Sequence, residues 1–125
     1  MSRLPIYTDS HFTEDEMACP CCGQMIIDPE FLFRLEALRR ILNIPLLVTS
    51  GYRCAEYNIK IKGHPRSLHM KGIAVDIAIK DVKQGERLKK AAFICKFNAI
   101  GIYSKHIHLD MRPGFSGHFF TGSYN

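Results

Sequence analysis

One stretch of the sequence reads Ser67-Leu68-His69-Met70-Lys71-Gly72-Ile73-Ala74-Val75-Asp76 and carries two side chains of metal-binding type, His69 and Asp76. Residues 73–79 alternate and are rich in β-branched residues, which predicts a strand. His69 then lies on the loop that enters this strand, and Asp76 returns to the same edge from within it. The stretch therefore predicts a strand with two metal ligands at one end.

A second stretch near the end of the chain reads His106-Ile107-His108-Leu109-Asp110. In a strand, alternate side chains share a face, so the two histidines and Asp110 point one way and the apolar residues point the other. Two histidines and one carboxylate with a free fourth position form the ligand set of catalytic zinc. Such a zinc lowers the pKa of its bound water to about 7 and polarises a carbonyl, which suits amide hydrolysis.

The remaining elements follow from capping residues and periodicity. A capping box at 13–16 predicts a short helix, and Asp28 followed by Pro29 predicts the start of a longer one. Further along we expect a strand at 46–50, helical turns at 54–61, a helix over 81–97, strands at 100–103 and 107–111, and an irregular tail at 113–125. Helices come first and strands cluster later, which predicts an α+β fold with a mostly antiparallel sheet of about four strands flanked by helices.

Composition places the chain among ordinary globular domains. It has 125 residues, 46% of them hydrophobic and 23% charged, so we expect a single domain and no disorder. We find no apolar run of membrane-spanning length and no signal peptide, and expect the protein to be cytoplasmic when made. The net charge of +5 favours anionic partners. The basic residues are spread along the chain, so they do not indicate the class of anionic partner.

Five cysteines are present, and three of them lie together in Cys19-Pro20-Cys21-Cys22-Gly23. The CxxC spacing of Cys19 and Cys22 is typical of half a zinc knuckle or of a redox pair. A structural zinc needs four ligands, however, and no second CxxC or HxxxH follows. Cys54 and Cys95 are isolated in the sequence. We therefore expect reduced, structural cysteines rather than a metal site.

The two histidine-containing stretches, in this order, resemble the zinc D-Ala-D-Ala carboxypeptidase family. The similarity rests on Ser67-x-His69-x-x-Gly72-x-Ala74-x-Asp76, on His106-x-His108, and on the upstream Ser50-Gly51-Tyr52-Arg53 segment. It covers roughly residues 11–112. The family belongs to a wider group with lysostaphin-type peptidases and the hedgehog signalling domain, and this chain is similar to its small phage and bacterial members.

The resemblance implies a role for each residue of these motifs. His69, Asp76 and His108 would hold one zinc ion per chain. Arg53 would bind the substrate carboxylate or the developing oxyanion, for which a planar, permanently charged guanidinium is suited. Ser67 would donate to the substrate backbone or cap the loop.

One position departs from the pattern of the dipeptidases in this group, which place an acid three residues before the last zinc histidine. That position is Lys105 here. Members with an HxH motif use the first histidine instead, which implies His106 as the catalytic residue that handles protons. Asp110 would lie on the substrate side with Arg53 and Ser67, and would also orient a histidine through its second nitrogen.

The function implied is hydrolysis of a peptide bond in peptidoglycan stem peptides by zinc-activated water, in an enzyme of phage or bacterial origin that acts on the cell wall. We expect a monomer with no nucleic-acid partner. One alternative is a binding module that keeps zinc and has lost catalysis, which Lys105 would favour. Another is a nucleic-acid-binding zinc module built on Cys19, Cys21 and Cys22, which the lack of a base-reading helix disfavours.

Overall fold

The structure is a computed structural model that describes residues 4–114 and 118–121. Its elements along the chain are α1 (Glu14–Met17), α2 (Pro29–Leu42), β1 (Val48–Ser50), α3 (Ala55–Lys60), the 3-10 helix η1 (Leu68–Lys71), β2 (Ala74–Ala78), α4 (Val82–Ile94), β3 (Ala99–Ile102), β4 (His106–Asp110) and β5 (His118–Thr121). The fold is α+β, as expected. Each helix and strand expected over residues 13–111 forms within a few residues of its expected bounds.

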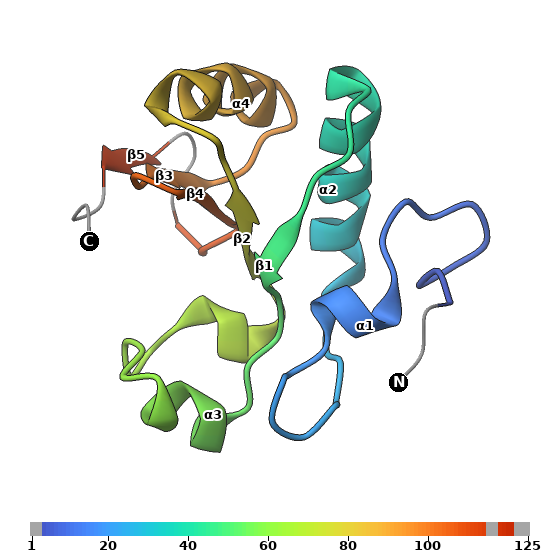
Figure 1. Ribbon diagram of the computed structural model, residues 1–125, viewed down its shortest axis with the longest axis vertical. Helices are drawn as coiled ribbons and strands as arrows, with labels where there is room; N and C mark the ends of the chain where they lie inside the picture. Colours follow the sequence, from blue (N-terminus) through green and yellow to red (C-terminus); the bar gives the residue numbers. More distant parts are fainter. Residues whose placement is uncertain (1–3, 115–117, 122–125) are drawn as a thin grey trace.

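The sheet has the strand order β1-β2-β4-β3-β5 (Figure 1). The first four strands in this order pair antiparallel, as predicted, whereas β5 pairs parallel with β3. The tail was expected to be irregular, and this was wrong for residues 118–121. They are aromatic or β-branched in part and occupy the free edge of β3, but the glycines and serines around them hid the strand signal. The expectation for 115–117 and 122–125 lies outside the described residues.

The helices begin where their capping residues predict. Thr13 and Glu16 form the reciprocal capping box of α1. Asp28 caps α2 by accepting from the backbone amides of residues 30 and 31, and Pro29 takes the first helical position. Asn43 ends α2 in the left-handed conformation. Local capping chemistry thus fixes the ends of α2.

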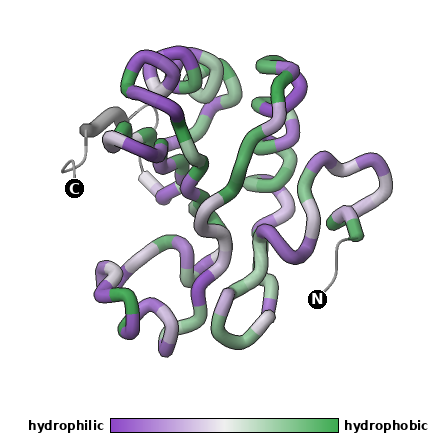
Figure 2. The backbone as a smooth tube through the Cα atoms, viewed as in Figure 1, coloured by the Kyte–Doolittle hydropathy of each residue, from purple (hydrophilic) through white to green (hydrophobic). Residues whose placement is uncertain are grey.

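The core lies between the sheet and the two long helices. Leu35 and Leu38 of α2, Leu88 of α4, and Ile107 and Leu109 of β4 are buried there. Figure 2 shows hydrophobic residues along the central strands and through α2 and α4. The segment of α3 and η1 lies on the opposite side of the sheet from α4 (Figure 1). One face of β4 therefore meets the core, and the other faces this segment.

Among the described residues, no helix combines the length and the apolar character that a membrane span requires.

Candidate metal centre

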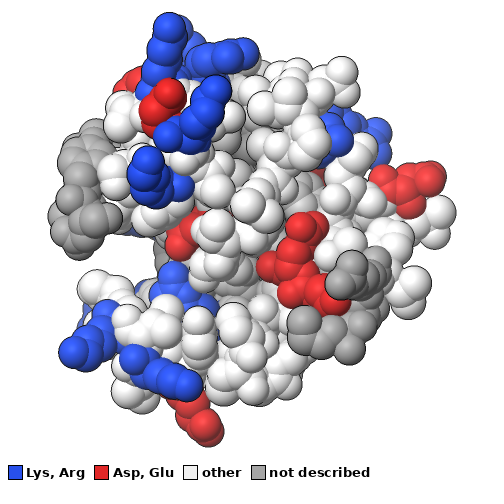
Figure 3. Space-filling view, viewed as in Figure 1, with Lys and Arg blue, Asp and Glu red and all other residues white. Residues whose placement is uncertain are grey.

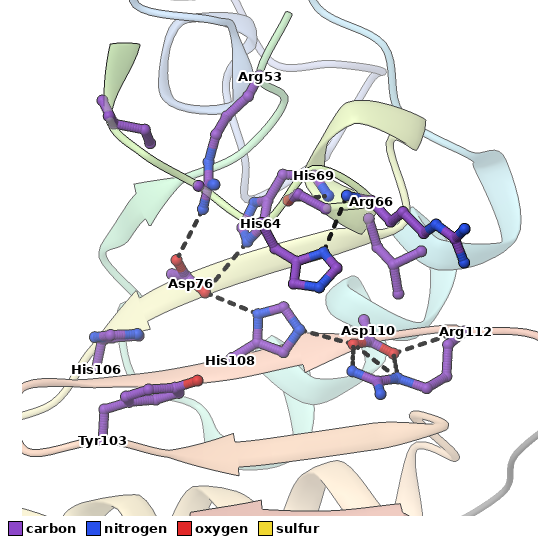
Figure 4. Close-up of a pocket in the computed structure, with 14 residues that line it drawn as sticks. Arg53, His64, Arg66, His69, Asp76, Tyr103, His106, His108, Asp110 and Arg112 are labelled. Carbon is purple, nitrogen blue, oxygen red and sulfur yellow. Dashed lines mark hydrogen bonds and ion pairs between the residues drawn. The ribbon is translucent and has the colours of Figure 1, made fainter. Parts of the chain in front are cut away.

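An open cavity of about 730 Å³ lies between the sheet and the segment that runs from Arg53 through α3 to η1 (Figure 4). Every side chain that the sequence singled out as a site residue lines this cavity: Arg53, Ser67, His69, Asp76, His106, His108 and Asp110. Lys105, in contrast, is exposed and is not among the lining residues. The fold thus gathers the candidate residues from three separate stretches of the chain.

Strand register places the carboxylate beside one of the histidines. In the antiparallel pair of β2 and β4, Asp76 lies directly opposite His108, and Ala74 lies opposite Asp110. Because opposed residues of an antiparallel pair share a face, both Asp76 and His108 point into the cavity. The small side chain of Ala74 leaves room beside Asp110.

The η1 helix brings the other histidine to the same place. The Ser67 side chain caps this helix by accepting from the His69 backbone amide. Gly72 ends it with a φ of 71°, and a side chain there would collide with the backbone of Ile26 at 2.5 Å. The glycine of the motif is therefore needed both for the turn and for the close approach of the chain.

Two histidine nitrogens converge on the Asp76 carboxylate (Figure 4). Its Oδ1 is 3.0 Å from Nδ1 of His108 and 3.4 Å from Nε2 of His69. One donor atom from each of these residues lies within 4.8 Å of the others. Two imidazoles and one carboxylate at such separations fit a tetrahedral zinc ion and leave one position free towards the cavity.

The second nitrogen of each histidine is held by an outer partner. Nδ1 of His69 donates to the backbone carbonyl of Gly51 at 2.8 Å, so its Nε2 is left with a free lone pair towards Asp76. Nε2 of His108 lies 2.7 Å from Oδ2 of Asp110. Outer contacts of this kind fix the ring orientation and tautomer of metal-binding histidines. Both rings are therefore set in place for ligation.

Charge in the cavity is balanced by these contacts. Burial alone would raise the pKa of Asp76, but hydrogen bonds from His108 and His69 hold it well below its usual range. Burial alone would lower the pKa of His108, but the carboxylates of Asp110 and Asp76 raise it to about 8. In the metal-free protein at neutral pH, the imidazolium of His108 thus sits between two carboxylates.

Asp110 is buried between a histidine and an arginine. Its side chain is 0% exposed, and it contacts His108 on one side and the Arg112 guanidinium, at 2.7 Å, on the other. Burial alone would raise its pKa, but these partners lower it to about 2. The contact with His108 is of the kind that orients an imidazole, and the substrate contact expected for Asp110 stays a prediction.

Arg53 reaches the cavity from the opposite wall. Its Nη2 lies 3.6 Å from Oδ2 of Asp76, and its other nitrogens donate to Ser50 Oγ and to Oδ1 of Asn58. The side chain is 12% exposed. The Arg53 guanidinium is therefore fixed beside the candidate metal ligands and is not a solvated surface group.

His106 lies on the cavity side of β4, two residues from His108. Its ring stacks on Tyr103, with centroids 4.4 Å apart and planes 10° from parallel. Burial lowers the pKa of His106; the Asp76 carboxylate opposes this shift, and the positive charges of His108, His69 and Arg53 add to it. His106 is thus uncharged at neutral pH.

Sequence reasoning missed three supporting residues: Asn58, Tyr103 and Arg112. Asn58 is buried and holds Arg53, Tyr103 stacks on His106, and Arg112 neutralises Asp110. Asn58 lies in the stretch that carries the family resemblance, and that position was its only signal. The roles of Tyr103 and Arg112 depend on pairings that only the folded chain reveals.

Comparisons with known proteins agree with this geometry. A search of curated proteins finds no match. A model of the peptidase M15 family, which includes the D-Ala-D-Ala carboxypeptidases and is zinc-dependent, matches residues 10–110. The matched region contains the three candidate ligands and both expected catalytic residues. The chain belongs to the peptidase M15 family of zinc metallopeptidases.

Proposed function

We propose that residues 1–125 form one zinc peptidase domain, with its core at about 11–112, that hydrolyses a peptide bond in peptidoglycan stem peptides. The bond would be of the D-Ala-D-Ala carboxypeptidase or endopeptidase type. The observation that carries the proposal is the convergence of His69, Asp76 and His108 in an open cavity that also holds Arg53 and His106.

His69 Nε2, Asp76 Oδ1 and His108 Nδ1 would hold the zinc ion. When bound, zinc supplies Lewis-acid polarisation of a carbonyl and lowers the pKa of a coordinated water. Asp110 and the Gly51 carbonyl keep the two imidazoles oriented for this task. The buried Arg112 contact keeps Asp110 ionised, so that it accepts the Nε2 proton of His108.

Arg53 and His106 would act on the substrate from two sides of the metal centre. The Arg53 guanidinium offers a fixed positive fork for a substrate carboxylate or for the oxyanion that develops during attack. His106, neutral and stacked on Tyr103, would accept a proton during attack and return it to the leaving amine. Ser67, whose hydroxyl caps η1 at the cavity wall, would donate to the substrate backbone.

The basic surface suits an acidic polymer. Figure 3 shows Lys and Arg side chains grouped over α4 and over the segment of α3, with a few acidic side chains among them and a larger acidic group over α1. Together with the net charge of +5, this arrangement favours approach to the anionic cell wall.

The proposal is tested by digesting purified peptidoglycan with zinc-loaded protein and analysing the soluble products by mass spectrometry. We expect new peptide termini at a single type of bond, which identifies that bond. The matched control is Asp76→Ala, which removes one ligand. If the zinc-loaded protein binds wall fragments but produces no new peptide termini, the proposal is contradicted and a binding module on the same scaffold is favoured.

A further inference from the structure

A second group of metal-binding side chains lies away from the histidine site. Cys19 and Cys21, in the loop after α1, meet Cys54, which caps α3. The Cys54 sulfur is 3.6 Å from that of Cys19 and 3.6 Å from that of Cys21. One sulfur from each of the three lies within 4.8 Å of the others. The fold therefore joins cysteines that are more than thirty residues apart.

The separation of the sulfurs fits a metal ion bound by all three thiolates. A disulfide would bring two sulfurs to about 2.05 Å. Thiolates around a tetrahedral zinc, with Zn–S bonds of about 2.3 Å, lie about 3.8 Å from each other. The observed 3.6 Å is close to the second value and far from the first.

Backbone amides already point at the sulfurs. The amide of Cys54 donates to the Cys19 sulfur at 3.4 Å, and the amide of Tyr57 donates to the Cys54 sulfur at 3.4 Å. Such donors stabilise thiolate over thiol and hold the sulfur in one orientation. Two of the three sulfurs are thus prepared for ligation.

The loop after α1 supplies a fourth candidate. It closes through a hydrogen bond from the Gly23 amide to the Cys19 carbonyl at 2.8 Å, and Gly23 turns the chain with a φ of 74°. Cys22 lies in this turn next to Cys21, and its side chain is exposed. Its sulfur is not in the group of three that lie within 4.8 Å of one another, so it would have to turn towards them to complete the set. Cys19 and Cys22 have the spacing of a zinc knuckle.

We propose that Cys19, Cys21 and Cys54, with Cys22 as the fourth ligand, bind a second, structural zinc ion. A closed set of thiolates selects a soft or borderline metal and leaves no position for substrate. The ion would tie the loop after α1 to the start of α3. Cys54 directly follows Arg53, so the same ion would anchor the backbone beneath the guanidinium that faces Asp76.

Metal analysis of protein purified under reducing conditions without added metal tests this assignment. We expect about two zinc ions per chain in the wild type and about one in His108→Ala. Adding Cys19→Ser to His108→Ala should leave none, whereas adding Cys95→Ala should leave one. Cys95 is the matched control because it is a buried cysteine outside the cluster.

Cobalt substitution gives a readout that needs no cysteine variant. Cobalt-loaded His108→Ala should show the near-ultraviolet charge-transfer absorption of cobalt bound to thiolates. A wild type with a single zinc and no such absorption would overturn the proposal, as would iron in place of zinc. A protein mass lower by two hydrogens, traced to a disulfide among these cysteines, would also overturn it. The absorption of cobalt bound to thiolates does not depend on peptidase activity. The cysteine site can therefore fail or hold whatever the outcome for the peptidase proposal.

Discussion

The two clusters of metal-binding side chains are built in opposite ways. The histidine site rests on paired strands, where the register of β2 and β4 sets Asp76 opposite His108. The cysteine cluster rests on a loop and a helix cap, and Cys19 and Cys54 meet only through the folded chain. The first presents two imidazoles and a carboxylate, whereas the second presents sulfurs alone. We interpret the histidine site as a site for catalysis and the cysteine cluster as a site that stabilises the fold.

The largest expected effect is that of His108→Ala, which removes a ligand from the strand-built site alone. We expect hydrolysis to fall below detection, because the remaining two ligands bind zinc weakly. The zinc bound by thiolates should stay, as elemental analysis would show. Full metal occupancy at both sites in this variant would refute the ligand assignment.

His106→Ala removes an imidazole beside the histidine site and leaves the ligands of both clusters unchanged. We expect full zinc content and a loss of about 10² to 10⁴ in turnover, the usual contribution of general acid–base catalysis. His106→Gln can donate a hydrogen bond but cannot shuttle a proton. Partial activity in Gln with none in Ala would assign electrostatic stabilisation instead, and loss of zinc in both would make His106 a ligand.

The same residue gives the activity a pH dependence. A general base must be unprotonated, and burial holds the pKa of His106 below its ordinary 6.5. The wild-type kcat/KM should therefore rise with pH below 6.5 and level off above it. In a pH profile of His106→Gln, the part of this rise that belongs to His106 should be missing. An unchanged profile in that variant would remove His106 from the proton-transfer step.

Arg53→Ala tests the residue that lies between the two clusters. We expect a loss of about 10² in activity, the scale for losing one donor to an oxyanion. We also expect a stability cost of about 1–3 kcal/mol, because the buried Asn58 loses a hydrogen-bond partner.

The control for this variant is Arg66→Ala, since Arg66 is an exposed arginine that lines the same cavity. It should change kcat/KM by no more than a few-fold. Equal losses of kcat/KM in both variants would mean that the positive charge of the cavity as a whole supports activity. Arg53 would then have no special role.

The smallest effect is expected from Asp110→Asn, which alters only the outer contact of His108. Loss of such a partner costs about 10- to 100-fold in metal affinity or activity. In the metal-free protein, the raised pKa of His108, about 8, stabilises the fold below pH 6.5, and this contribution is lost as the pH rises through 8. Chemical denaturation across this range should show a shallower decline for Asp110→Asn. An identical decline would mean that Asp110 does not set the His108 pKa.

The sequence predicted which side chains of the strand-built site share a face, because strand periodicity is a local property. Alternation placed His106, His108 and Asp110 on one face, and a motif placed His69 near Asp76. Nothing in the sequence indicated that Cys54 contacts Cys19 and Cys21, and Cys54 was interpreted as isolated. No pattern near that residue indicates contact with a loop more than thirty residues away. The sequence also failed to predict β5, whose partner β3 supplies the context that its own residues lack. Contacts set by tertiary structure, such as that of Arg112 with Asp110, left no trace in spacing.

The claim that His69, Asp76 and His108 bind the metal that drives peptide-bond hydrolysis is tested by titrating zinc into metal-free protein. Hydrolysis of purified stem peptides is followed by mass spectrometry. We predict that product formation rises with zinc occupancy in the wild type and is absent at every zinc concentration in Asp76→Ala. Equal hydrolysis by the metal-free and zinc-loaded proteins, or by Asp76→Ala, would contradict the claim.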